Sequence, residues 1–532
     1  MSSPAPKSPE MSEKSKKYDR QIRLWGENGQ SLLEQAQICV INATALGSEI
    51  LKGLILPGVG GFTIVDEKTV TEEDVGCNFF LELNCVGQSR AQACARGLLE
   101  LNPDVRGDYV DESPEQLLEK NPDFFKNFKV VVATSLSEKT TIQLSNHLWE
   151  LNVPLIVCRS IGFMGSLRIQ IKELTVVESH PDNKSSDLRL VEPFPALEKH
   201  FQRTELSSKT PWIEILYHYL QIWRKSNEGR IPKTYKEKTE LKDLIKAGMT
   251  ADEENYEEAI RAVNSNLGGG KATSDIRKIL DDDSCLNLSR NSTPFWVMAH
   301  AVRKFELKEG NGWLPVEGVI PDMTADTKSY IALQQVYKNQ FNHDVEIVMK
   351  YVQDLIQELD LPYDYVSEQD IKIFCRNANS LHLVRGTKIS DEYDKSTIAN
   401  IVASGLENPS SLMEHYVTLR ATEKFLMEYG VLPGECQMEP DAARLKSCVS
   451  KLISDWGCSA IPREDLSHEL CRYGGSEIHS VSAFIGGCVT QEVIKIVTRQ
   501  FKPLHNTFIY DAITSSTVRI QPNVLVLISM LS

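Results

Sequence analysis

Apolar residues in the first 170 positions alternate between short continuous runs and segments with helical spacing. The continuous runs are rich in Val and Ile, which is typical of strands buried on both faces. They cover residues 37–42, 62–66, 128–136 and 153–162. The segments with helical spacing cover residues 49–56, 86–103 and 140–152. Strands that alternate with helices predict an open, mostly parallel α/β sheet with right-handed connections.

The pattern changes after residue 171. A polar stretch broken by prolines, residues 178–197, is followed by helical periodicity that continues from Trp212 to about Asp455. A buried helix predicted at 479–498 and a strand predicted at 506–512 then resume the α/β pattern of the first 170 residues. We therefore predict a large, mostly helical insert between two parts of one α/β domain.

The domain boundaries expected from these changes place the α/β domain at residues 18–170 and 478–520 and the insert at 171–477. Residues 1–17 are rich in Ser, Pro, Lys and Glu, a composition that predicts a disordered tail. The apolar stretch 521–532 is treated as a second tail.

Residues 37–66 form a strand, a turn, a helix and a second strand that ends in an acid, Asp66. This order is typical of a nucleotide-binding βαβ unit, whose turn reads G-x-G-x-x-G. Here the corresponding positions are Asn42, Ala43, Thr44, Ala45, Leu46 and Gly47. Only the last glycine is kept, the one needed for packing the helix on the strand. The sequence predicts a unit that keeps its fold and lacks the phosphate cradle.

Composition excludes several classes of function. The 532 residues include 41% hydrophobic and 25% charged residues, which is ordinary for a globular protein of two to four domains. A net charge of −15 without a basic stretch argues against a nucleic-acid surface. The 12 cysteines contain no C-x-x-C pair, which argues against zinc or redox sites. The cysteines interpreted as reduced cytosolic thiols are Cys77, Cys85, Cys94, Cys158, Cys448 and Cys471. Because no run of eighteen apolar residues exists, no membrane span is expected.

Four motifs in the correct order resemble the ubiquitin-activating enzyme family. They are KYDRQIRLWG at 17–26, the degenerate turn ending in Val-Asp, GQSRAQA at 87–93 and AFIGGCVTQEVIKIVT at 483–498. The resemblance implies a Rossmann-like, ThiF-type domain with the helical insert. The length is close to half of a full activating enzyme, which implies the non-catalytic subunit of a heterodimeric activator. The long insert favours a subunit of the neddylation activator. The alternative is the smaller subunit of the sumoylation activator.

Carried over residue by residue, the resemblance implies a pseudo-adenylation domain. Active members carry S-N-L-N-R-Q-F where this chain has EDVGCNF, so Cys77 stands for the arginine and Asn78 for the glutamine. Arg90 replaces a phosphate-binding lysine, and residues 133–135 replace an aspartate. Only Asp66 matches, as the ribose-binding acid. We therefore expect this chain to bind no cofactor, with ATP and Mg held by the partner subunit.

Arg20 and Arg23 lie three residues apart near the start of the ordered chain. Their residue type alone favours solvated surface charges. In the family, however, the arginine of Tyr-x-Arg-Gln reaches across the dimer to the ATP of the active half. The resemblance therefore makes Arg20 a candidate catalytic contributor in trans, with Arg23 as a weaker candidate.

The insert resembles the domain that carries the catalytic cysteine in active members. A reactive thiol needs a basic neighbour or a helix N-terminus to lower its pKa. None of the candidate cysteines has such a local signature. They are Cys285, Cys375, Cys436, Cys448, Cys458 and Cys471. The resemblance therefore places the thioester cysteine on the partner.

Tyr330, Leu333, Val336 and Tyr337 share one face of a predicted helix. Such a stripe is either core or, because aromatic residues are enriched at interfaces, a docking segment for the catalytic subunit. The resemblance also implies a ubiquitin-like modifier and the amyloid precursor protein cytoplasmic tail as partners. The expected location is the cytoplasm, with the nucleus and partner-mediated association with a membrane as further expectations. A self-sufficient nucleotide enzyme and a pure adaptor protein are the competing classes.

Overall fold

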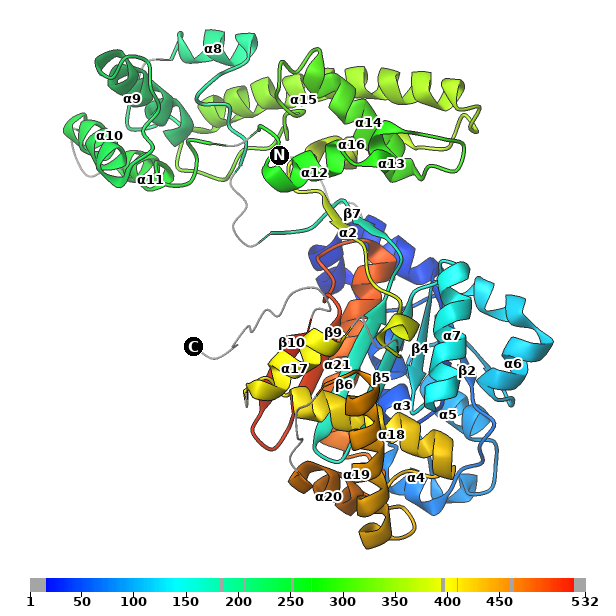
Figure 1. The fold of residues 1–532 in the computed structure, drawn as a ribbon. Coiled ribbons are helices and arrows are strands. Elements are labelled where there is room, and N and C mark those ends of the chain that lie inside the picture. The colour runs from blue at the N-terminus through cyan, green and yellow to red at the C-terminus, as the bar shows by residue number, and fades with distance from the viewer. Residues whose placement is uncertain are drawn as a thin grey trace, which may run out of the picture. The chain divides into compact units, whose positions relative to one another are not determined.

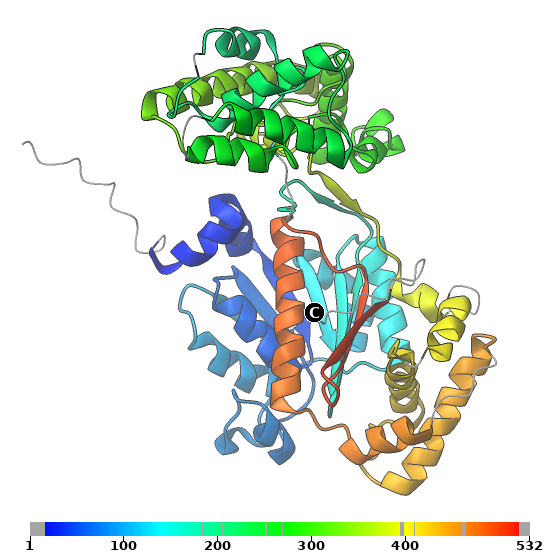
Figure 2. The same cartoon turned by 90° about the vertical axis from the view of Figure 1, so that its left-hand side faces the viewer.

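The computed structural model describes residues 16–181, 186–204, 206–249, 253–268, 270–393, 398–408, 410–458 and 464–520. The chain divides into two compact units (Figures 1 and 2). The first unit joins Met1–Leu174 to Val384–Ser532, and the second is Thr175–Leu383. The tails expected at 1–17 and 521–532 lie outside the described residues, apart from Lys16 and Lys17.

An eight-stranded sheet in the order β10-β9-β6-β5-β4-β1-β2-β3 forms the centre of the first unit. The strands are β1 (Gln37–Ile41), β2 (Gly61–Val65), β3 (Arg106–Val110), β4 (Val130–Thr134), β5 (Leu155–Ile161), β6 (Met164–Gln170), β9 (Thr507–Asp511) and β10 (Ser516–Ile520). The five strands from β3 to β5 pair in parallel, as predicted. The pairs β5–β6, β6–β9 and β9–β10 are antiparallel. The C-terminal segment therefore completes the sheet.

Helices cover both faces of this sheet. They are α2 (Asp19–Gln35), α3 (Ala45–Ile55), α4 (Glu72–Cys77), α5 (Arg90–Leu99), α6 (Pro114–Lys120), α7 (Glu138–Glu150), α17 (Ala399–Glu407), α18 (Met413–Tyr429), α19 (Met438–Asp455), α20 (Glu464–Tyr473) and α21 (His479–Thr498). The 3₁₀ segments among the described residues of this unit are η1 (Leu83–Cys85), η2 (Pro122–Asn127) and η3 (Ile389–Tyr393). Strand side chains such as Cys39 and Ile41 pack with Leu144 and Leu148 of α7 in one core cluster. Ile38 and Val40 are also fully buried, which explains the continuous apolar run of β1.

Helix α21 runs along the sheet and packs against α3 (Figure 2). Thr490 Oγ1 donates a hydrogen bond to the Ile50 carbonyl at 3.2 Å. A Cβ at Gly53 would lie 2.5 Å from Thr490 Oγ1, so the close approach of the two helices requires glycine there. Among the described helices, α21 alone is long and apolar enough to cross a membrane, and 61% of its apolar window is buried. Its packing as a core helix accounts for that composition.

The first unit contains more of the chain than the sequence predicts. Residues 384–477, assigned to the insert, belong to the sheet unit, so the insert ends at Leu383. Val417 of α18 and Leu445 of α19 share a core cluster with Met164 of β6 and Ile509 of β9. Helical periodicity shows that a face is buried but does not identify the surface that covers it. A second difference is the short helix α4, which lies outside the predicted elements and begins with a capping box at Thr71.

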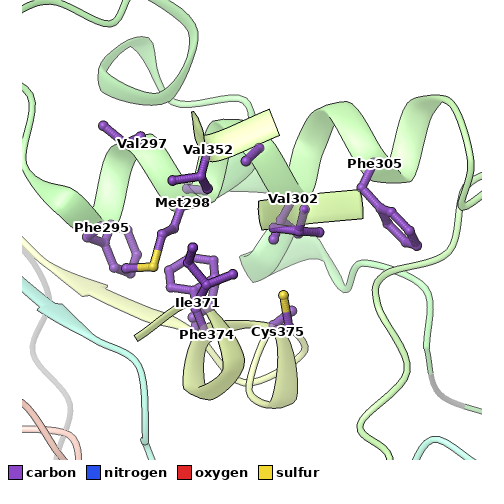
Figure 3. Packing of buried hydrophobic residues seen from close by; sticks show 14 of the residues in the cluster. Phe295, Val297, Met298, Val302, Phe305, Val352, Ile371, Phe374 and Cys375 are labelled. Carbon is purple, nitrogen blue, oxygen red and sulfur yellow. The ribbon is translucent and has the colours of Figure 1, made fainter. Parts of the chain in front are cut away.

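The second unit is built from helices α8 (Pro195–Phe201), α9 (Trp212–Ser226), α10 (Tyr235–Ala247), α11 (Glu254–Ala262), α12 (Ser274–Leu280), α13 (Asp283–Leu286), α14 (Pro294–Leu307), α15 (Thr327–Glu358) and α16 (Glu368–Arg376). Strands β7 (Leu174–Val176) and β8 (His382–Val384) pair where the chain enters and leaves it. Its described residues form two core clusters. Figure 3 shows one of them, in which Phe295 and Met298 of α14 face Phe374 of α16. The predicted helical character of this region is confirmed.

Candidate functional site

The degenerate turn connects β1 to α3 at the carboxyl end of the parallel strands, where α/β folds bind ligands. Asn42 has a φ of 68°, a left-handed conformation that asparagine tolerates better than most residues. Its side chain is held by a 2.7 Å hydrogen bond from Nδ2 to the Thr134 carbonyl. A Cβ at Gly47 would lie 2.5 Å from the Asn42 carbonyl oxygen, so this glycine serves close packing, as predicted.

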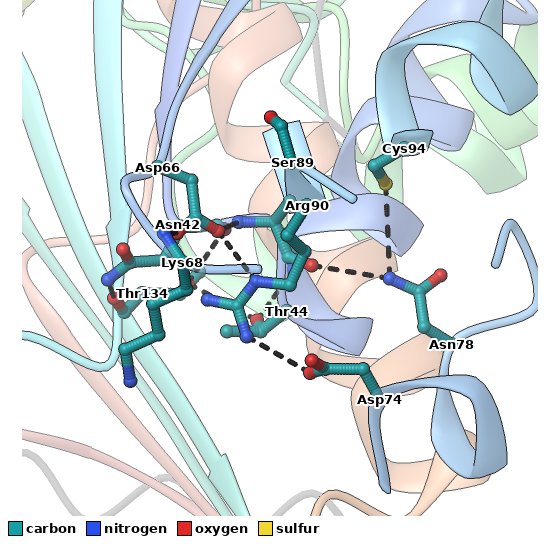
Figure 4. Close-up of polar contacts among 12 residues, drawn as sticks. Asn42, Thr44, Asp66, Lys68, Asp74, Asn78, Ser89, Arg90, Cys94 and Thr134 are labelled. Atoms are coloured by element: carbon teal, nitrogen blue, oxygen red, sulfur yellow. Dashed lines mark hydrogen bonds and ion pairs between the residues drawn. The ribbon is translucent and has the colours of Figure 1, made fainter. Parts of the chain in front are cut away.

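Asp66, the one acid that matches the family's ribose ligand, is fully engaged inside the chain (Figure 4). Its Oδ2 accepts hydrogen bonds from the Ala43 amide at 2.8 Å and from Arg90 Nε at 2.7 Å. Its Oδ1 accepts from the Lys68 amide at 3.0 Å. Arg90 also bonds to Asp74 at 3.0 Å, so the guanidinium lies buried between two carboxylates. The cation that replaces the phosphate-binding lysine is therefore neutralised within the fold.

The residues that replace the family's Arg-Gln pair also have structural partners or low reactivity. Asn78 is buried, and its Nδ2 donates to Ser48 Oγ at 2.8 Å and to the Ala43 carbonyl at 3.3 Å. Burial raises the pKa of the Cys77 thiol to about 11, so this side chain is neutral near pH 7. These positions stabilise the turn and supply no positive charge for a triphosphate.

A carboxylate from a distant part of the chain lies at the N-terminus of α3. Oε2 of Glu477 accepts the Leu46 amide at 3.1 Å, and the Ala45 amide and the Thr44 side chain also act to lower the pKa of this carboxyl. Its Oε1 is buried and has no hydrogen-bond partner among the described residues. A helix N-terminus attracts anions because its first amides are unpaired and the helix dipole is positive there. Glu477 thus takes the place that a phosphate takes in a nucleotide-binding βαβ unit.

The Glu477 carboxyl experiences two opposing effects. Burial raises its pKa from the usual 4.5 to about 7, and the hydrogen bonds from α3 only partly offset this rise. The residue lies just before α21 and 431 positions from Leu46, so sequence reasoning missed it. No local pattern marks a glutamate whose function depends on such a distant contact.

The first turn of α2 presents Arg20 to solvent. Tyr18 is buried, and its hydroxyl accepts a 3.0 Å hydrogen bond from Asn102 Nδ2. Gln21 Nε2 donates to the Pro57 carbonyl at 3.1 Å. Arg20, between these two anchors, is exposed and forms no ion pair within the described residues. Arg23 pairs instead with Asp19 at 3.0 Å on the same helix.

The predicted docking stripe on α15 is mostly core. Leu333 and Tyr337 are fully buried in the second unit. The Tyr337 hydroxyl donates to the Leu188 carbonyl at 2.6 Å, and its ring meets Phe194 edge-on. The docking interpretation is therefore wrong for these two residues, because the chain's own helices cover them. Tyr330 and Val336 are partly exposed at the edge of the same cluster, where docking stays a prediction.

Five of the six candidate cysteines lack the environment of a thioester nucleophile, whereas Cys436 is exposed. Burial raises the thiol pKa of Cys375 and Cys458, and raises that of Cys285 and Cys471 to about 12. Cys448 is raised to about 11, with Glu428 as a further cause. A nucleophilic cysteine requires the opposite shift.

Three comparisons place the chain among known proteins. The model of the ThiF family matches residues 18–524. A Nedd8-activating enzyme E1 regulatory subunit from Drosophila melanogaster is 52% identical over 523 residues, covering 98% of this chain and 100% of the relative. The chain belongs to the ThiF family, in the branch of NEDD8-activating enzyme E1 regulatory subunits.

The branch extends to plants. The regulatory subunit AXR1 of the NEDD8-activating enzyme from Arabidopsis thaliana is 40% identical, covering 95% of this chain and 96% of the relative. The solved structure of E. coli MccB with succinimide is 14% identical with a TM-score of 0.28 and covers 31% of this chain and 50% of that one. The family assignment does not depend on that likeness. The resemblance drawn from the four sequence motifs is confirmed.

Proposed function

We propose that this ThiF-family chain is the non-catalytic half of a heterodimeric enzyme that activates NEDD8. Its partner is a catalytic subunit that binds ATP and Mg, adenylates the modifier's C-terminus and transfers it as a thioester to a conjugating enzyme. The observation that carries the proposal is the turn after β1, where Asp66, Arg90 and Glu477 already bind one another or the backbone. Helix α3 thus has a carboxylate where a nucleotide-binding domain needs a phosphate.

The isolated chain should not bind Mg-ATP, because the Glu477 side chain occupies the first amides of α3 and Arg90 is paired with two carboxylates. Titration calorimetry of the chain alone should show no heat above dilution. The partner subunit, measured in parallel, serves as the positive control. Micromolar binding to the isolated chain would contradict the proposal.

Arg20 is proposed to act on ATP in the partner's site. The proposal is supported by the exposure of the Arg20 guanidinium on a helix that is anchored by Tyr18 and Gln21. Negative charge grows on the leaving pyrophosphate during adenylation, and a fixed cation stabilises that change. Loss of one charge-assisted contact of about 2 kcal/mol slows a reaction roughly 30-fold. Arg20→Ala in the purified heterodimer should therefore reduce ATP–pyrophosphate exchange by about that factor without dissociating the subunits.

Two control variants make this test specific. Arg20→Lys should restore part of the exchange, because charge returns without the planar guanidinium fork. Arg23→Ala removes a neighbouring exposed cation that is already paired with Asp19, and it should leave exchange nearly unchanged. Equal exchange rates in Arg20→Ala and the wild type at subsaturating ATP would show that Arg20 is an ordinary surface charge with no role in the reaction.

The remaining expectations are narrower proposals. The names of the relatives favour NEDD8 over the sumoylation modifier, and exchange assays with each modifier would separate the two. Residence in the cytoplasm and nucleus, membrane association through a partner and binding of the amyloid precursor protein tail are retained as proposals. Capture of this chain by an immobilised tail peptide, compared with a scrambled peptide, would test the last. An adaptor without enzymatic role would bind the tail yet show no effect of Arg20→Ala on exchange.

A further inference from the structure

A buried asparagine outside the four sequence motifs holds the start of α2. Asn102 lies between α5 and β3 and is 1% exposed. Its Nδ2 donates to the Tyr18 hydroxyl at 3.0 Å and to the Ile55 carbonyl at 2.8 Å. Its Oδ1 accepts from Lys17 Nζ at 2.6 Å and from the Asp104 amide at 3.2 Å. An asparagine side chain offers two donors and two acceptor lone pairs, so all four are used here.

The Tyr18 side chain fits a space that a glycine leaves open. A Cβ at Gly58 would lie 2.7 Å from the Tyr18 hydroxyl oxygen, and the φ of Gly58 is 86°, a conformation that favours glycine. The hydroxyl donates to Asp104 Oδ2 at 3.4 Å, and Tyr18 is 2% exposed. Packing and hydrogen bonds together hold this side chain in place.

Residues 55–58 at the end of α3 also hold the other side of Arg20. Gln21 Nε2 donates to the Pro57 carbonyl in this segment at 3.1 Å. Arg20 follows two positions after Tyr18 and directly precedes Gln21, and its side chain is exposed. The backbone of Arg20 is therefore held from both sides, although its side chain extends into solvent.

The placement of that backbone matters for chemistry at a distance. A fixed cation stabilises a transition state when it is already in position as charge develops. A misplacement of about 1 Å by a mutation far from the reacting atoms can reduce a rate roughly 100-fold. Because the guanidinium moves with the backbone that carries it, a looser first turn of α2 would move Arg20 out of position.

We propose that Asn102 is a positioning residue for adenylation in the partner subunit and that it acts through Tyr18 on the placement of Arg20. The inference rests on the proposed function of Arg20 and extends it to a residue 84 positions from Tyr18 in the chain. A purely structural clamp would make the same hydrogen bonds, so the experiment must separate the two roles.

ATP–pyrophosphate exchange by the purified heterodimer provides that separation. Tyr18→Phe keeps the ring and removes only the hydroxyl, whereas Asn102→Ala removes the whole amide. Both should slow exchange by at least roughly threefold, and by no more than the roughly 30-fold expected for Arg20→Ala. Each variant is then combined with Arg20→Ala. A residue that acts through Arg20 has nothing left to position there, so the double variants should match Arg20→Ala alone.

Asn255→Ala is the matched control. Asn255 is also 1% exposed, and its Nδ2 donates to the Thr210 carbonyl at 2.8 Å, but it lies in the second unit. This variant loses comparable buried hydrogen bonds and should leave exchange unchanged. Because Asn102→Ala leaves buried groups unpaired and could fold poorly, Tyr18→Phe is the variant that decides.

The outcomes distinguish this inference from the proposed function. With Arg20→Ala slow, wild-type exchange in Tyr18→Phe would overturn the inference and leave the role of Arg20 intact. A loss in Tyr18→Phe that persists in full in the Arg20→Ala background would also overturn it, because the effect would not pass through Arg20. Wild-type exchange in Arg20→Ala would refute the proposed function of Arg20, and the inference with it.

Discussion

Glu477→Gln tests whether the carboxylate at the start of α3 is held there at an energetic cost. Glutamine keeps the shape and an oxygen that accepts the Leu46 amide, but it carries no charge. The Glu477 pKa lies near 7 in the folded chain and near 4.5 when the group is solvated. The folded protein therefore favours the protonated form. Below about pH 4.5 this group makes its full contribution to stability, and the contribution is lost as the pH rises through 7.

The size of the effect follows from those two values. At 1.36 kcal/mol per pH unit, the interval from 4.5 to about 7 corresponds to about 3 kcal/mol. Glutamine does not titrate, so the variant escapes this loss. The two proteins should have similar free energies of unfolding near pH 4.5, and the variant should be more stable by about 3 kcal/mol above pH 7. The helix dipole and the charged hydrogen bonds are already included in the pKa, so they do not add to this figure.

The measurement is the free energy of unfolding of the first unit across this pH range. Because the chain has two units, the transition must be followed by a probe in the first unit, such as hydrogen exchange of the α3 amides. Exposed Glu67→Gln serves as the matched control and should show no difference that grows with pH. A Glu477→Gln variant that is less stable than the wild type at pH 8, or a difference independent of pH, would refute the reasoning.

Two further substitutions test the interpretation of buried positions. Leu333→Ala should destabilise the second unit by about 2–5 kcal/mol in denaturant melts, because it leaves a cavity beside Tyr337. The control Ile331→Ala, at an exposed position, should change the free energy of unfolding little. A Leu333→Ala chain of normal stability that fails to pair with the catalytic subunit would restore the docking interpretation. Asp66→Ala should cost about 3–5 kcal/mol in the first unit, because it leaves Arg90 and the Ala43 amide without a buried partner, and a loss below about 1 kcal/mol would show that Asp66 has no structural role.

The elements of the sheet and the loss of its phosphate cradle were predictable because both depend on local sequence. Continuous Val- and Ile-rich runs bury both faces of a parallel strand wherever the strand lies, and β1, β2, β4 and β5 are confirmed. The turn that begins at Asn42 lacks two glycines, and no tertiary contact replaces the close backbone approach that they allow. Tyr18, Arg20 and Gln21 belong to one short sequence motif, so they could be identified without the structure. Only the structure shows which of their side chains is exposed.

Other features depended on which surfaces meet in three dimensions. The stripe of Leu333 and Tyr337 has the spacing of a buried face, but that spacing is the same for a core and for a docking surface. Periodicity likewise could not assign α18 to the sheet unit rather than to the insert. Glu477 and the Leu46 amide that it binds are 431 positions apart, so no window of sequence contains both. Local sequence determines the elements because backbone geometry is local, whereas burial, charge pairing and the filling of the degenerate turn depend on tertiary packing.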